Sequence, residues 1–83
     1  MDRKRLGKRI KAFRKLKGYT QMSLAKHLGV SVAVLGDVER GTKEANDELI
    51  AKIVLALAVS QEELMLEQQV GYGEQNKDER YIN

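Results

Sequence analysis

Positive charge is concentrated at the start of this 83-residue chain, where it could neutralise a polyanion. Residues 1–17 contain nine Lys or Arg and one Asp, a local charge of +8. Residues 18–83 contain six Lys or Arg and eleven Asp or Glu, a local charge of −5, and the two parts sum to the net charge of +3. Clustered cations favour nucleic-acid binding, because each neutralised phosphate releases condensed counterions. The charge pattern alone fits a solvated basic helix face equally well.

The residue types needed for catalysis or metal binding are scarce. The chain has no cysteine, which excludes disulfides and thiolate metal sites, and its one histidine, His27, is too few for a zinc site. Glu62 and Glu63 are adjacent on an expected helix and therefore lie on different faces. Ser31 and Ser60 suit helix caps better than nucleophiles. We expect no enzymatic activity, no metal, no cofactor and no small-molecule ligand.

No segment is typical of export or membrane insertion. The basic start, Met1 to Arg5, is not followed by the apolar stretch that a signal peptide requires. The longest apolar stretch, residues 49–59, has eleven residues, includes Lys52 and is too short to span a bilayer. These observations predict a cytoplasmic protein with no role at a membrane.

Apolar residues recur at spacings of three and four and proline is absent, which predicts an all-α fold. The first expected helix, residues 3–17, ends at Gly18. Its inward positions recur at helical spacing: Leu6, Ile10, Phe13, and Leu16 or Lys17. We expect five helices around one core within residues 1–67. Residues 68–83 are polar and contain glycine, which predicts a flexible tail.

Capping residues mark the starts of the later helices. Thr20 suits the start of a helix that ends at Leu28, and Ser31 the start of a helix from residue 32 to residue 40. The turn Gly29-Val30-Ser31 leaves no room for a long loop. Two helices of about eight residues joined by such a turn are typical of a helix-turn-helix. Further caps are expected for a fourth and a fifth helix: Asn46, and Ser60 with Glu63 in a capping box.

With these residues in place, the chain resembles the lambda-repressor-like (Xre/Cro-type) helix-turn-helix proteins. The resemblance covers roughly residues 6–65 and depends on segments that occur in order at matching spacings: Leu6-Gly7-Lys8-Arg9-Ile10, Phe13-Arg14, Gly18-Tyr19-Thr20-Gln21, Leu24-Ala25, Leu28-Gly29-Val30-Ser31, Val38-Glu39-Arg40-Gly41 and Leu57-Ala58-Val59-Ser60. It implies a compact five-helix domain that binds double-stranded DNA with its third helix in the major groove. It also implies a transcriptional regulator, a repressor similar to phage repressors or restriction–modification controllers.

The resemblance assigns roles to individual residues. Thr20 and Gln21 would lie at the start of the second helix, where backbone amides and the Gln side chain can bind a phosphate oxygen. Arg14 and Glu39 match a paired Arg and Glu that connect the first helix to the end of the third. We interpret this pair mainly as a scaffold salt bridge, with phosphate contact by Arg14 as the lesser alternative.

The outward face of the third expected helix is poor in hydrogen-bond donors. Val34, Leu35 and Val38 share one face, which must be the core face. The opposite face carries the residues that would approach DNA: Val32, Ala33, Gly36, Asp37 and Arg40. Members of the family usually carry polar side chains there, whereas this chain has only one donor, on Arg40. A glycine in a helix costs about 1 kcal/mol relative to alanine, so Gly36 indicates a close approach or a local steric need.

Three interpretations of this face are open. In the first and preferred one, apolar contacts to thymine methyls, an Asp37 contact to a cytosine amino group and DNA shape together specify an operator. In the second, the protein binds DNA with weak sequence preference through basic residues such as Lys8, Arg9 and Lys43. In the third, the face binds a protein partner, as in an antitoxin, an anti-repressor or an adaptor.

The fourth expected helix is more apolar than one buried face requires. The family pattern assigns the core positions to Ile50, Ile53, Val54, Leu57, Val59 and Leu64. Four apolar residues are left over and form the expected two-fold dimer interface: Leu49, Leu55, Met65 and Leu66. A homodimer would supply stability that a small core lacks. It would also place two recognition helices about one DNA turn apart, roughly 34 Å, on a palindromic operator.

Overall fold

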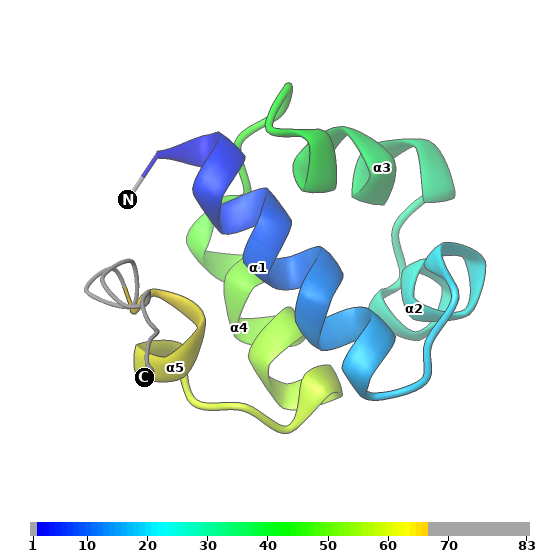
Figure 1. Ribbon diagram of the computed structural model, residues 1–83. Helices are drawn as coiled ribbons and strands as arrows, with labels where there is room; N and C mark the ends of the chain where they lie inside the picture. Colours follow the sequence, from blue (N-terminus) through cyan, green and yellow to red (C-terminus); the bar gives the residue numbers. More distant parts are fainter. Residues whose placement is uncertain (1, 67–83) are drawn as a thin grey trace, which may run out of the picture.

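A computed structural model describes residues 2–66 of the chain. It contains five helices in the expected order and no strand within these residues (Figure 1). The helices are α1 Arg3–Leu16, α2 Gln21–Leu28, α3 Val32–Arg40, α4 Asp47–Leu57 and α5 Gln61–Leu64. The predicted all-α, five-helix fold is confirmed. The predicted tail, residues 68–83, lies outside the described residues.

Every helix begins at a side-chain cap. The four caps expected from the sequence accept a hydrogen bond from the backbone N–H three residues ahead: Thr20, Ser31, Asn46 and Ser60. Asp2 caps α1 in the same way, with Oδ1 accepting from the Arg5 N–H at 2.8 Å. That backbone hydrogen bond holds the pKa of Asp2 below its ordinary value. Satisfied first-turn amides explain why these short helices begin where they do.

The core is formed by apolar side chains from all five helices. Its largest fully buried members are Ile10, Leu24, Leu35, Ile53, Leu57, Leu64 and Val38. In Figure 1, α1 crosses the middle of the molecule with α3 along one side and α4 and α5 along the other. None of the helices within residues 2–66 has the length and apolar character needed to cross a membrane.

The inward stripe of α1 differs from expectation at its end. Leu16 is 75% exposed, and Lys17 is the C-cap with an exposed side chain, so neither continues the stripe. The reason is helical geometry, because Leu16 is six residues from Ile10 and is rotated by roughly 120° from the buried face. Arg14, four residues after Ile10, takes the buried position instead. The expectation for Leu16 and Lys17 is therefore wrong.

Glycine allows α1 and α3 to approach at backbone distance. An ideal Cβ built on Gly7 would lie 2.5 Å from the Val38 carbonyl oxygen and nearer still to the Glu39 carbonyl oxygen. At Gly41, where φ is +80°, a Cβ would lie 2.7 Å from Cγ of Lys4. Any side chain at either position would push the two helices apart. The close approach places the end of α3 directly against α1.

Candidate nucleic-acid interface

The turn between α2 and α3 has the expected form. Gly29 ends α2 in the left-handed conformation with φ of +75°, and Ser31 caps α3 two residues later. Three side chains of α2 are buried against the core: Leu24, Ala25 and Leu28. Leu35 and Val38 bury the facing side of α3. Both helices are therefore anchored from the inside, and α3 presents its opposite face to solvent (Figure 1).

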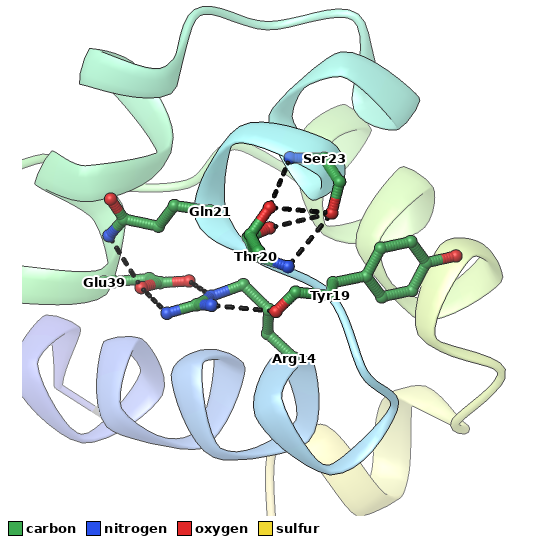
Figure 2. A network of polar contacts seen from close by, with 6 residues as sticks. All are labelled: Arg14, Tyr19, Thr20, Gln21, Ser23 and Glu39. Carbon is green, nitrogen blue, oxygen red and sulfur yellow. Dashed lines mark hydrogen bonds and ion pairs between the residues drawn. The ribbon is translucent and has the colours of Figure 1, made fainter.

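A buried polar network connects α1, α2 and α3 (Figure 2). The guanidinium of Arg14 donates to Glu39 through Nε at 2.7 Å and Nη2 at 3.2 Å, and the two side chains are only 8% and 2% exposed. Nη1 of Arg14 donates to the Tyr19 carbonyl oxygen at 3.0 Å. Gln21 Nε2 donates to Glu39 Oε1 at 3.0 Å. This is the scaffold pair expected from the sequence, extended by two partners.

Gln21 is thus oriented by the core of the molecule while it lies at the start of α2. Its amide has two hydrogens, of which Glu39 accepts one, so the other can bind a second acceptor. Thr20 is exposed and is bonded within a capping box, since Thr20 Oγ1 accepts from the Ser23 N–H and Ser23 Oγ from the Thr20 N–H. The first-turn amides of a helix attract anions. Thr20 and Gln21 together form a site whose chemistry suits a phosphate.

The outward face of α3 is less uniform than its sequence suggests. Val32 is 43% exposed, Ala33 and Arg40 are exposed, and Asp37 is half-buried. Gly36 is buried, because the guanidinium of Arg40 lies over it. Arg40 Nη2 donates to Asp37 Oδ1 at 2.6 Å, so the one donor on this face is paired with the one acid. Their spacing of three residues on a helix is a signal from which this pair could have been expected.

Lys43 is exposed in the loop between α3 and α4. It lines a shallow depression together with Val30, Val34 and Leu49. Val34 is therefore half-buried at the rim of the helix pair and is not a full core residue. Among residues 2–66, no three His, Asp or Glu side chains gather as metal ligands would.

Comparison with known proteins places this geometry in a family. The sequence profile of the helix-turn-helix family matches residues 10–64. The chain belongs to the Xre-type, lambda-repressor-like helix-turn-helix family. The HTH-type transcriptional regulator YazB of Bacillus subtilis is 50% identical over 58 residues, which cover 70% of this chain and 84% of YazB.

Solved structures of several other proteins have the same fold. The clp gene regulator ClgR of Corynebacterium glutamicum is 39% identical with a TM-score of 0.71, over 75% of this chain and 80% of ClgR. The restriction–modification controller protein C.AhdI of Aeromonas hydrophila is 33% identical with a TM-score of 0.70, over 74% of this chain and 92% of C.AhdI. The DNA-binding domain of SinR from Bacillus subtilis is 34% identical with a TM-score of 0.70, over 77% and 94% of the two chains. The protein is a DNA-binding transcriptional regulator of this family and not an enzyme, as expected from its sequence.

Two of the nine cations in the basic segment of this Xre-type regulator serve the fold. Arg14 is buried in the network described above. Arg9 donates through Nε to the Leu64 carbonyl oxygen at 2.9 Å and through Nη2 to that of Glu63, and its guanidinium lies 5.5 Å from the centre of the Phe13 ring. Arg9 therefore holds the end of α5 against α1, while its expected role as a phosphate contact stays a prediction. The partner carbonyls lie more than fifty residues away, which no local pattern reveals.

The four residues expected to form a dimer interface differ in exposure. Leu55 is 81% exposed on α4. Leu49 and Met65 are half-buried and pack against the core, and Leu66 is half-buried. Leu49 and Met65 are thus not surplus to the core, which leaves Leu55 as the principal free apolar side chain of the four. Two other apolar residues are also exposed: Leu16, which was expected to face the core, and Met22, which the sequence did not single out.

Proposed function

We propose that this Xre-type regulator represses transcription by binding a palindromic operator as a homodimer, with α3 in the major groove. One observation carries the proposal. The core face of α3 is anchored by Leu35, Val38 and Glu39, while Val32, Ala33 and Arg40 on the other face are exposed to solvent. A rigid helix with a free face is the element that the major groove accepts.

Phosphate contacts from two segments beside α3 would fix its register on the duplex. At the start of α2, Thr20 and Gln21 offer a helix N-terminus and an amide oriented by Glu39. In the loop that follows α3, Lys43 is exposed. Such contacts position a protein on DNA without reading its sequence. Val32 and Ala33 would then contact thymine methyl groups in the groove.

Dimerisation would double these contacts and match a palindrome by symmetry. Leu55, with most of its side chain exposed on α4, is the residue that we assign to the centre of this interface. Leu49, Met65 and Leu66 would contribute through the parts of their side chains that the core leaves free. The name of C.AhdI as a restriction–modification controller, and that of ClgR as a gene regulator, support a regulatory role of this kind.

A second function, protein binding by the same face, is favoured by one observation. Arg40 is already paired with Asp37, and the neighbouring Val32 and Ala33 are apolar. An exposed apolar face with few free donors is also suited to a polypeptide partner, as in an antitoxin, an anti-repressor or an adaptor.

Selection from a pool of randomised duplexes separates these functions. We expect the full chain to enrich a palindromic sequence and to bind it more tightly than scrambled duplex at physiological salt. Lys43→Ala should weaken the binding of both duplexes alike and lower the slope of log K against log salt by about 1. Arg5→Ala removes the same charge from the side of α1 opposite Gly7 and serves as its control. Failure to enrich any sequence would favour the protein-binding function.

A further inference from the structure

The guanidinium on the outward face of α3 is held by a carboxylate one turn earlier in the same helix. Arg40 Nη2 donates to Asp37 Oδ1 at 2.6 Å, and the two side chains are 63% and 44% exposed. An exposed ion pair of this kind stabilises a fold by only about 0–1 kcal/mol. Its more important consequence is geometric, because it selects one orientation of a long and flexible side chain.

Gly36 provides the space for that orientation. A Cβ built on Gly36 would lie 3.1 Å from Nη1 and 3.6 Å from Nη2 of Arg40. The guanidinium therefore lies over the bare backbone of Gly36, where any other residue would crowd it. The helix accepts a residue of low helix propensity at this position. An alanine at this position would require the exposed guanidinium of Arg40 to shift by a few tenths of an ångström, which fits the local steric need inferred from the sequence.

The fixed guanidinium keeps most of its donors. Arginine has five N–H groups in a planar fork, and the bond to Asp37 uses one of them. Two adjacent donors on such a fork match the O6 and N7 acceptors of guanine in the major groove. The carboxylate of Asp37 repels phosphate oxygens and so disfavours the alternative in which Arg40 binds the DNA backbone.

We propose that Arg40 reads a guanine in each half of the operator, and that Asp37 and Gly36 are its positioning residues. Asp37 then acts on Arg40 and does not itself accept from a cytosine. The inference depends on the proposed function, since it requires α3 to lie in the major groove. It adds the identity of a base that the operator must contain and of the side chain that recognises it.

Methylation interference on the selected operator tests the inference. Methylation of one guanine N7 in each half-site should block the wild-type protein. Arg40→Ala should lose roughly 10- to 100-fold in affinity for the operator, the range expected for one bidentate contact. The same variant should lose much less affinity for scrambled duplex than for the operator, and it should become insensitive to methylation of that guanine.

Substitutions of the two positioning residues provide a readout that a merely structural role would not change. Asp37→Asn keeps the size of the side chain and removes its charge, so the affinity for operator should fall while that for scrambled duplex rises. Gly36→Ala should reduce operator affinity without changing the affinity for scrambled duplex. Lys43→Ala serves as the control and should weaken both duplexes equally.

Three outcomes would overturn the inference alone. If Arg40→Ala weakens operator and scrambled duplex equally, Arg40 contacts phosphate. If Asp37→Asn loses a preference for a cytosine in the operator, Asp37 itself contacts that base. If the Arg40→Ala protein still requires the guanine, Arg40 does not recognise it. Failure of the wild-type protein to select any sequence would instead overturn the proposed function and this inference together.

Discussion

Arg14 of α1 and Glu39 of α3 form a buried, two-point ion pair that joins residues 25 positions apart in the chain. The adjacent residue, Arg40, is exposed on the face that would meet DNA. A single turn of α3 thus contains both the residue that anchors the helix and the residue that is free to bind. Because Glu39 also accepts from Gln21, the same carboxylate orients a side chain at the start of α2. The position of α3 and the proposed phosphate site therefore depend on one buried group.

Breaking the buried pair should be costly. Arg14→Ala or Glu39→Ala leaves an unpaired charge in the interior, and we expect a loss of about 3–5 kcal/mol in the free energy of unfolding. Urea denaturation followed by circular dichroism measures this loss. Arg40→Ala, which breaks the exposed pair with Asp37, is the matched control and should cost no more than about 1 kcal/mol. The double variant Arg14→Ala/Glu39→Ala should lose less than the sum of the two single alanine variants, and strict additivity would argue against coupling.

Gly7→Ala should separate α1 from α3. The added methyl group would lie 2.5 Å from the Val38 carbonyl oxygen, so the backbones must move apart. We expect a destabilisation of about 1–3 kcal/mol despite the better helix propensity of alanine. Thermal denaturation measures it. Lys8→Ala, at the next position of the same helix and exposed, should shift stability by less than about 0.5 kcal/mol. Equal thermal denaturation midpoints for Gly7→Ala and Lys8→Ala would contradict the close packing of α1 against α3.

Leu55→Glu should convert the proposed homodimer to a monomer. A carboxylate at the centre of an apolar interface must either lose its hydration or keep the subunits apart. Sedimentation equilibrium at tens of micromolar protein measures the change. Leu16→Glu is a well-matched control, because Leu16 is 75% exposed and Leu55 is 81% exposed, and they lie on different helices. A monomer caused by Leu16→Glu, with Leu55→Glu still dimeric, would move the interface to α1.

Arg9→Ala should release α5 from α1. The variant loses the hydrogen bonds to the Glu63 and Leu64 carbonyl oxygens, and charged hydrogen bonds contribute about 1.5–3 kcal/mol before solvent exposure reduces them. Hydrogen exchange at the Leu64 and Met65 amides should become faster, while exchange in α2 stays as in wild type. Lys8→Ala, which removes a neighbouring exposed charge, should leave α5 protected. Unchanged exchange at α5 in Arg9→Ala would show that the contact is dispensable.

The sequence determined those features that depend on residues three or four positions apart. Caps such as Thr20 and Ser31 act on amides three residues ahead, and Gly29 ends a helix through its own φ angle. Helix starts, the tight turn and the identity of α3 could therefore be predicted. The Asp37–Arg40 pair has the same local character and could have been predicted from its spacing. The family resemblance added the Arg14–Glu39 pair, which spacing alone does not reveal.

Only the tertiary structure decided which charged side chains are hydrogen-bonded within the protein and which apolar side chains are buried. Arg9 and Lys8 are adjacent and both basic in sequence, yet Arg9 is hydrogen-bonded to the Leu64 carbonyl oxygen at the end of α5, whereas Lys8 is exposed. Leu49 and Leu55 are equally apolar residues of α4, yet the core takes up part of Leu49 and almost none of Leu55. The physical reason is that burial depends on which distant helix lies opposite a side chain. Composition and periodicity describe a residue and its own helix, but not the neighbour that packs against it.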